Sequence, residues 1–310
     1  MLSIRWIVNG GLLGLPIGVT LAILFALQEH HRSTGQGGSL WTDNKVVTTQ
    51  YCQKSYGITP ESDGQQYTLN PNQWGVDSTT TGGLCMNVTT HNNGTYATNT
   101  TAPLWSVTWK YSQGPETQPV HAYPNAKLDG VLPDRLSSIS AINMTFHWNY
   151  DMGNDSATTT DTTTLVSNSV NANVAMDLFI DSDKTQAQNS SSADYEIMVW
   201  FAAIGSATQA IGQHDGVLAT ETAGGVSFSL YGGTNSLSQK VLTWMPASPV
   251  TKFDGDLMSL VNKTLSLTGE MYPSSSDYLG YLAIGSETYY SNDFVTFTVS
   301  DLAIDLKLSA

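Results

Sequence analysis

The chain has 310 residues, of which 12 are Lys or Arg and 26 are Asp or Glu, so its formal net charge is −14. This acidic balance repels phosphate backbones, and we expect no nucleic acid partner. Only 12% of the residues are charged, whereas Thr, Ser, Asn, Gly, Trp and Tyr are frequent. Such a composition is typical of a secreted β-protein that handles neutral, hydroxylated ligands.

The N-terminal segment is apolar and almost free of charge from residue 6 to residue 27. A length of about 20 residues is enough to cross a bilayer, and Arg5 before it favours a cytoplasmic N-terminus. A cleaved signal peptide, whose apolar region has about 7–15 residues, is the alternative. We therefore expect residues 1–28 to be a transmembrane signal anchor or a signal peptide, and residues 29–44 a flexible stem. The domain at 45–310 is then extracellular, either membrane-anchored (type II) or secreted.

Two further features agree with this location. Cys52 and Cys85, the only cysteines, would close a loop of about 34 residues as a disulfide, worth ~3–4 kcal/mol on the chain-entropy estimate. Metal ligation by these two cysteines is the weaker alternative. Seven Asn-x-Ser/Thr sequons indicate a glycosylated surface. They begin at Asn87, Asn93, Asn99, Asn143, Asn154, Asn189 and Asn262.

Residues 45–310 contain many short runs in which apolar and polar residues alternate, bounded by Gly, Asn, Asp and Pro. This period of two predicts β-strands in one all-β sandwich domain. The clearest runs are residues 105–111, 142–150, 174–180, 195–201, 226–231, 240–246 and 294–300. Residues 256–263, with Leu257, Leu260 and Val261 at helical spacing, predict the single short helix. Two polar segments, 153–164 and 182–192, are predicted to be solvated loops.

The run at residues 195–201 is strongly apolar and has a carboxylate in its middle, Glu196. Alternation along a strand puts Glu196, Met198 and Trp200 on one face and residues 195, 197, 199 and 201 on the other. The second face is expected in the core, and the first on the floor of a wet groove. An ionised carboxylate in apolar surroundings is costly, so Glu196 is a candidate functional residue. The alternative is a structural Glu paired with Arg or Lys.

Two other carboxylates have a similar setting. Glu287 follows the run Tyr281–Ser286 at a strand end, and Asp177 lies inside the apolar run 175–179. Apolar packing raises a carboxyl pKa, which suits a general acid near neutral pH. Two carboxylates that face one cleft are the groups that glycoside hydrolysis requires. A neighbouring carboxyl such as Asp177 can share a proton with Glu196.

Other chemistries find little support in the sequence. It contains no G-x-S-x-G, G-x-x-x-x-G-K-[ST] or H-E-x-x-H motif, and its six histidines have no ligand spacing. We therefore expect no metal site. Trp74, in the turn-rich segment 70–75, is difficult to bury and could stack on a sugar ring.

Several of these segments together resemble glycoside hydrolase family 12, the fungal and bacterial endoglucanases and xyloglucanases. Residues 195–205 look like the nucleophile strand of that family, and residues 174–179 like the strand whose Asp contacts the nucleophile. Residues 284–287, followed by 294–300, are similar to its acid/base strand. The resemblance covers about residues 50 to 306 in consistent order, and Tyr123–Ala126 and the two cysteines also fit it.

The resemblance implies an all-β, concanavalin A-like jelly-roll sandwich of two antiparallel sheets with one short helix. It assigns the nucleophile role to Glu196, the acid/base role to Glu287, and contact with the nucleophile to Asp177. Residues 72–75 resemble the Asn-Asn-Leu-Trp-Gly segment of the family, so Asn72 and Trp74 would line glycone subsites.

The substrate-binding residues also include Met198, which shares a face with Glu196, and Tyr56, which stands where the family usually has a Trp after the first cysteine. Thr288–Tyr289 replace the usual Pro and aromatic after the acid/base Glu, and residues 210–212 lack a common proline. These departures concern subsite affinity and substrate preference more than the reaction.

We therefore predict a monomeric, retaining endo-β-1,4-glucanase that acts on cellulose-like or xyloglucan chains and needs no metal or organic cofactor. Glu196 would form a glycosyl-enzyme, and Glu287 would serve as acid and then as base. The alternatives are a non-catalytic glucan-binding protein on the same fold and a purely structural cell-surface β-sandwich.

Overall fold

The computed structural model describes residues 46–116 and 118–309, together with residues 23 and 26. Apart from residues 23 and 26, the predicted signal anchor or signal peptide at 1–28 and the stem at 29–44 lie outside the described residues. Within the described residues, no helix has both the length and the apolar character to cross a membrane.

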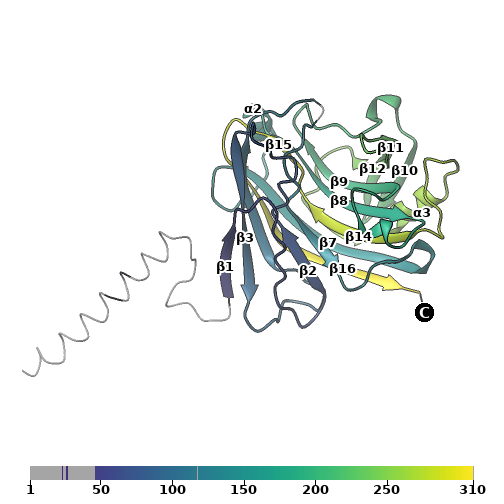
Figure 1. The fold of residues 1–310 in the computed structure, drawn as a ribbon, viewed down its shortest axis with the longest axis horizontal. Helices are drawn as coiled ribbons and strands as arrows, with labels where there is room; N and C mark the ends of the chain where they lie inside the picture. Colours follow the sequence, from purple (N-terminus) through teal and green to yellow (C-terminus); the bar gives the residue numbers. More distant parts are fainter. Residues whose placement is uncertain (1–22, 24–25, 27–45, 117, 310) are drawn as a thin grey trace, which may run out of the picture.

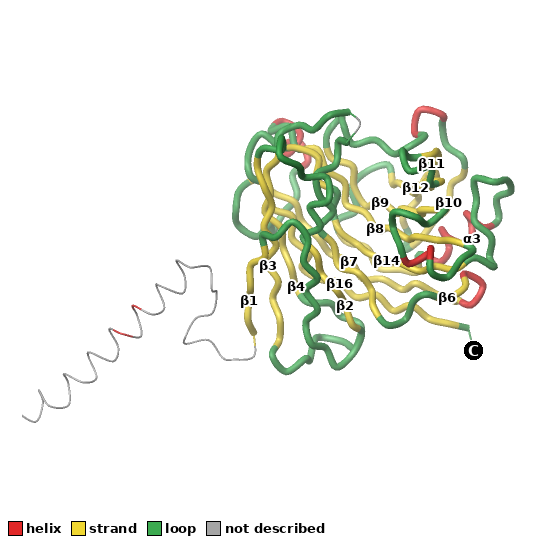
Figure 2. Tube along the Cα trace, viewed as in Figure 1, coloured by secondary structure: helices red, strands yellow, loops and turns green. Residues whose placement is uncertain are grey.

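Two β-sheets lie face to face and form a sandwich (Figures 1 and 2). The six-stranded sheet has the order β1-β3-β4-β16-β7-β13. The ten-stranded sheet has the order β10-β11-β12-β9-β8-β14-β5-β2, with β15 beside β8 and β6 beside β14. The strands are β1 (Val46–Tyr51), β2 (Gln66–Asn70), β3 (Gly82–His91), β4 (Leu104–Tyr111), β5 (Asn125–Asp129), β6 (Asp134–Arg135), β7 (Ile139–Met152), β8 (Asn171–Asp181), β9 (Tyr195–Ile204), β10 (Ala219–Ala223), β11 (Val226–Thr234), β12 (Lys240–Pro246), β13 (Lys252–Asp256), β14 (Tyr278–Gly285), β15 (Thr288–Tyr290) and β16 (Val295–Leu308).

All seven strands predicted from alternation are present, and most extend beyond their predicted ends. The prediction of two antiparallel sheets is wrong at one pair, because β12 runs parallel to β9. The reason lies in the connection: β10, β11 and β12 pair antiparallel in succession, which brings the chain back beside β9 in its original direction.

The predicted helix is present as α3 (Met258–Leu265), two residues later than expected. A second helix, α2 (Thr162–Ser167), was not predicted; its first residues belong to a segment expected to be a loop. The side chain of Asp161 caps it by accepting hydrogen bonds from the backbone N–H groups of Thr163 and Thr164, at 3.0 and 3.3 Å. The other polar segment, 182–192, is a loop with one short 3-10 turn, as predicted.

The main core lies between the two sheets. On β9, Ile197, Val199 and Phe201 are buried in it, which confirms the predicted core face of that strand. The predicted disulfide between Cys52 and Cys85 is present, with an S–S distance of 2.00 Å, and joins the end of β1 to β3.

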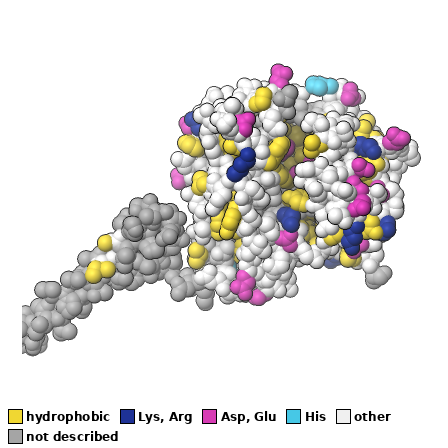
Figure 3. All heavy atoms as spheres, in the orientation of Figure 1, with side chains coloured by type: hydrophobic (Ala, Val, Ile, Leu, Met, Phe, Trp, Pro, Cys, Tyr) yellow, Lys and Arg dark blue, Asp and Glu magenta, His cyan; other side chains and the backbone are white. Residues whose placement is uncertain are grey.

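The opposite face of the ten-stranded sheet, turned away from the six-stranded sheet, carries Asp177, Glu196 and Met198; we call it the groove face. Here Met198 and Trp200 pack with Val241 in a small apolar cluster separate from the main core. A hollow with hydrophobic and acidic side chains at its bottom is visible in Figure 3. Two other hollows, of about 220 and 630 Å³, are lined mainly by the six-stranded sheet and contain none of the three predicted carboxylates.

Candidate active site

Glu196 and Asp177 are neighbours on the groove face. Strands β8 and β9 are antiparallel; Phe179 pairs with Glu196, and Asp177 pairs with Met198. The two carboxylates are therefore diagonal partners on adjacent strands, a relation that places Cα atoms about 7–8 Å apart. Asp177 is 5% exposed, and its Oδ1 atom is buried without a hydrogen-bond partner in the described part of the chain.

Glu287 reaches the same site from the end of β14, between that strand and β15. Asn173 on β8 holds it in place through three hydrogen bonds. The Asn173 backbone N–H donates to the Glu287 carbonyl at 3.1 Å, and the Glu287 N–H donates to Asn173 Oδ1 at 2.9 Å. In addition, Asn173 Nδ2 donates to Glu287 Oε2. The amide of Asn173 thus fixes both the backbone and the carboxylate of Glu287.

A buried chain of hydrogen bonds supports this arrangement from behind. The Ser286 hydroxyl donates to the Asn173 carbonyl at 2.6 Å and lies 3.3 Å from the Tyr150 hydroxyl. Trp109 Nε1 donates to that Tyr150 hydroxyl at 2.6 Å. Asn173 was missed in the sequence analysis, although it lies in the segment Val170–Asp181, which is almost entirely buried. The same strand also carries Asn171 and Asp177, so the strand alone does not single out Asn173; its contact with the distant Glu287 does.

The three carboxyl groups interact electrostatically. Burial, followed by the nearby charge of Glu287, raises the pKa of Glu196 to about 8. Burial raises the pKa of Glu287 to about 7, against the opposing effect of the hydrogen bond from Asn173. The pKa of Asp177 lies well above its ordinary value because of burial and the charges of Glu196 and Glu287. The group therefore retains protons at neutral pH that ordinary carboxyls have lost.

This arrangement does not fit a structural ion pair. Within the described residues, neither Glu196 nor Glu287 forms an ion pair with Lys or Arg. Nor does that part of the chain contain a group of three or more His, Cys, Asp or Glu side chains that could hold a metal ion. Chemically, the site offers one carboxylate to attack and one carboxylic acid to donate a proton, both on the same face.

Tyr123 is a second residue of the site that was not singled out. Its hydroxyl is 3.1 Å from the carbonyl oxygens of Ala175 and Ala283, which places the ring across β8 and β14. The charges of Asp177, Glu287 and Glu196 add to burial in raising the pKa of this hydroxyl well above its ordinary value. Tyr123 is therefore a buried residue that packs across β8 and β14 close to the three carboxylates.

Asn72 and Trp74, which were predicted to line glycone subsites, follow β2, and Tyr56 lies beside the end of that strand. Asn70 Oδ1 accepts hydrogen bonds from the backbone N–H groups of Tyr56 and Asn72, at 3.1 and 2.8 Å. Trp74 and Tyr56 expose 50% and 49% of their surface, and Tyr56 stacks on Tyr51 with ring centroids 5.7 Å apart. These exposed rings are available for stacking on sugars.

Met198, in contrast, is 6% exposed and packed beneath neighbouring side chains. It supports the surface next to Glu196 and offers little area to a ligand.

Replacing Asn173 with Ala is expected to lower kcat by about 10- to 100-fold, because Glu287 loses the group that orients it. The lost hydrogen bond favours the ionised form of Glu287, so the pKa of Glu287 should rise in the variant. The alkaline limb of the pH profile, where kcat falls as Glu287 loses its proton, should then lie at higher pH in the variant than in the wild type. The measurement is the pH dependence of kcat on a soluble β-glucan, the class of substrate that the sequence resemblance implies.

The matched control is Asn171→Ala on the same strand. Asn171 is also buried and hydrogen-bonded, but its partners are Ala207 and Ser169. This control should keep the wild-type position of the alkaline limb. An unchanged limb in Asn173→Ala would show that Asn173 does not tune Glu287.

Comparison with known proteins agrees with the family resemblance noted in the sequence. The family model described as Glycosyl hydrolase family 12 matches residues 65–307. The chain is 33% identical over 236 residues to Xyloglucan-specific endo-beta-1,4-glucanase A of Emericella nidulans, an alignment that covers 76% of this chain and 84% of that protein. It is 30% identical over 240 residues to Endoglucanase A of Aspergillus kawachii, with 76% and 85% covered.

Solved structures agree in fold. Endoglucanase 3 of Trichoderma harzianum has a TM-score of 0.64 and 25% identity, and the match covers 84% of this chain and 98% of that one. The catalytic domain of Humicola grisea Cel12A, in complex with a soaked thio cellotetraose, has a TM-score of 0.64 and 23% identity, with 83% and 99% covered. The two-sheet sandwich described above is thus the fold of these proteins too.

Proposed function

The chain belongs to glycosyl hydrolase family 12, and from this premise we propose that it is a retaining endo-β-1,4-glucanase that acts on xyloglucan and cellulose-like chains. The observation that carries the proposal is the placement of Glu196 and Glu287 on one groove, where burial raises the pKa of both carboxyls to near neutrality. Because close, buried carboxyls resist ionising together, the group can hold one ionised carboxylate as the nucleophile and one protonated carboxyl as the proton donor.

In the proposed mechanism, the Glu196 carboxylate attacks the anomeric carbon while Glu287 gives its proton to the departing glycosidic oxygen. The C–O bond to the leaving chain breaks, and a covalent ester to Glu196 forms. Glu287, now ionised, takes a proton from water as the water attacks the same carbon and releases Glu196. Asp177, whose pKa lies well above its ordinary value, carries a proton that it can donate in a hydrogen bond to the ionised Glu196.

The names of several relatives support xyloglucan as a substrate. Relatives from Emericella nidulans and Aspergillus niger are both named xyloglucan-specific endo-beta-1,4-glucanase A, whereas the Aspergillus kawachii relative is named Endoglucanase A. The non-catalytic alternative gains no support from these names, and both carboxylates are in place. We also propose that the domain works outside the cell, in keeping with its disulfide.

The test is an assay of hydrolysis on xyloglucan, carboxymethyl-cellulose and mixed-linkage glucan. The release of reducing ends measures the rate. We expect hydrolysis with xyloglucan as the best substrate, and β-anomers as the first products in a proton NMR time course. First products of α configuration would contradict the retaining mechanism, which requires carboxyl groups about 5–5.5 Å apart. A folded protein that binds these glucans and hydrolyses none would favour the glucan-binding alternative.

A further inference from the structure

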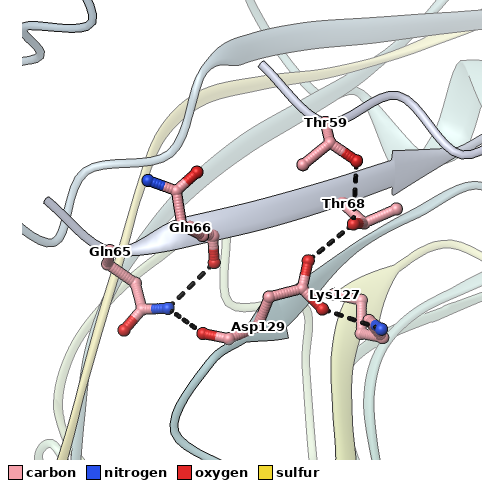
Figure 4. Close-up of polar contacts among 6 residues, drawn as sticks. All are labelled: Thr59, Gln65, Gln66, Thr68, Lys127 and Asp129. Atoms are coloured by element: carbon pink, nitrogen blue, oxygen red, sulfur yellow. Dashed lines mark hydrogen bonds and ion pairs between the residues drawn. The ribbon is translucent and has the colours of Figure 1, made fainter. Parts of the chain in front are cut away.

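A charged pair lies on the groove face, away from the three carboxylates. Lys127 Nζ is 2.7 Å from Asp129 Oδ1, and both side chains project from β5. The other carboxylate oxygen of Asp129 accepts a hydrogen bond at 2.5 Å from Thr68 Oγ1 on β2, and Thr59 Oγ1 lies 3.3 Å from Thr68 Oγ1 (Figure 4). Gln65 Nε2 donates to the backbone carbonyl of Asp129 at 2.5 Å. The pair is therefore held in a fixed position by side chains of the adjacent strand and its flanks.

The strand register places this pair on the same surface as the active site. Ala126 and Leu128 of β5 are in the main core, so the alternating residues Lys127 and Asp129 face the groove. Lys127 pairs with Ala283 on β14, and Ala283 pairs with Asp177 on β8. Neighbouring strands are about 4.8 Å apart, so Lys127 lies about 10 Å from the Asp177 strand and about 14 Å from the Glu196 strand. The distance from Lys127 to the Glu196 strand exceeds the length of two linked glucose rings, so a sugar at Lys127 is at least the third one from the reacting bond.

Two aromatic rings lie between the two places, the buried ring of Phe179 and the half-buried ring of Tyr281. Phe179 pairs with Glu196 on one side and with Tyr281 on the other. The rings of Phe179 and Tyr281 meet edge to face with centroids 5.4 Å apart, and Lys127 Nζ is 6.0 Å from the centroid of the Tyr281 ring. A chain that passes over Glu196 and these rings therefore reaches Lys127 without leaving the groove face. This side of the sheet is also the side of Asn72 and Trp74, which follow β2.

The chemistry of the pair suits a neutral sugar. The side chains of Lys127 and Asp129 are 36% and 24% exposed, so both are open to a ligand. An ammonium group has three N–H donors, and a carboxylate has about four acceptor positions. In the described residues Asp129 is the one ion-pair partner of Lys127, which leaves donors for a hydroxyl oxygen. Neighbouring hydroxyls of one ring can then accept from Lys127 and donate to Asp129.

We propose that Lys127 and Asp129 form a distal sugar-binding site that holds the third or a later glucosyl unit on the glycone side of the scissile bond. The inference rests on the proposed endoglucanase function and names residues that set its preference for long chains. Because the contact is far from the reacting bond and similar in the ground and transition states, it should affect KM and leave kcat largely unchanged.

The test compares Lys127→Met and Asp129→Asn with the wild-type protein on long and short substrates. We expect KM for xyloglucan and for cellohexaose to rise about 10-fold, the effect of losing a hydrogen bond to a charged group, with kcat within about 2-fold. On an aryl β-cellobioside, which has only two sugars, both constants should stay at wild-type values. Lys127→Arg, which keeps the charge and the donors, should recover most of the affinity for the long chains.

Lys307→Met is the matched control. Lys307 pairs with Asp305 two residues away on β16, as Lys127 pairs with Asp129, but on the six-stranded sheet. The Lys307→Met variant should leave kcat and KM unchanged on the long and the short substrates. A wild-type KM for long chains in both Lys127→Met and Asp129→Asn would overturn the proposal, as would an equal loss on the cellobioside. If Lys127→Met fails to fold, as judged by its melting curve, Asp129→Asn decides alone. A folded wild-type protein that hydrolyses no glucan would refute the proposed function itself, a separate result.

Discussion

The variant Glu196→Gln is expected to hydrolyse β-glucans at least about 10⁴-fold more slowly than the wild-type protein. Gln has the size of Glu but no negative charge, so it cannot form the glycosyl ester, whereas the groove keeps its shape. Affinity electrophoresis in xyloglucan should therefore show binding close to that of the wild type. The rate is measured as reducing ends released over hours at high enzyme concentration.

Chemical rescue gives this prediction a sharper outcome. In Glu196→Ala, azide can enter the space left by the carboxylate and attack an activated aryl glycoside from the face that Glu196 used. One displacement in place of two inverts the configuration, so the product should be an α-glycosyl azide. A β-glycosyl azide, or activity near the wild-type level, would show that Glu196 is not the nucleophile.

The same Glu196→Gln variant should also change stability in a pH-dependent way. Burial raises the pKa of Glu196 from 4.5 to about 8, and Glu196 shares protons with the neighbouring carboxyls, so between these values the folded site holds a proton that the unfolded chain has lost. The stability contributed by this group is therefore present at low pH and is lost as the pH rises toward 8. Gln resembles the protonated acid at every pH. The melting temperature of the variant should match the wild type at pH 4 and exceed it by several degrees at pH 8, a gain of about 1–3 kcal/mol. The control Glu270→Gln changes an exposed glutamate and should show no such trend.

The variant Glu287→Ala is expected to lose about 10²- to 10⁴-fold of its rate on natural glucans, the usual contribution of a general acid. The loss should be much smaller for an aryl glycoside with a dinitrophenolate leaving group, which departs without a proton. In that case the glycosyl-enzyme forms quickly but hydrolyses slowly, because no base activates water. The measurement is a stopped-flow trace, which should show a burst of phenolate followed by a slow steady state.

Azide distinguishes the two carboxylates. In Glu287→Ala, azide should attack the glycosyl-enzyme from the face where Glu287 stood and give a β-glycosyl azide, because two displacements have then occurred. The alkaline limb of the pH profile should also disappear in this variant, since Glu287 no longer titrates. Equal losses on natural and activated substrates would exclude the acid role of Glu287.

Features that depend on a short stretch of residues could be predicted from the sequence. The alternation at residues 195–201 predicts the two faces of β9, and the structure confirms that Ile197, Val199 and Phe201 are core. The disulfide and the place of α3 were also predicted correctly. These predictions succeed because one strand, one helix or one pair of cysteines contains the whole signal.

What the sequence analysis missed depends on contacts between distant residues. Asn173 contacts Glu287 across 114 positions, and Lys127 shares a surface with Asp177 only because β14 lies between their strands. The parallel pairing of β12 with β9 has the same origin, since alternation describes one strand and not its neighbour. Asp161, which caps α2, is a local signal that was present but not recognised.

The place of β16 in the six-stranded sheet bears on how the protein is made. This strand, Val295–Leu308, pairs with β4 on one side and with β7 along nearly its whole length on the other, yet it is the last strand of the described chain. While the ribosome is still adding these residues, β4 and β7 have no partner between them, and each presents an open edge to which other chains can add. The six-stranded sheet can therefore be completed only after synthesis passes residue 308, and until then the two open edges expose the nascent chain to aggregation.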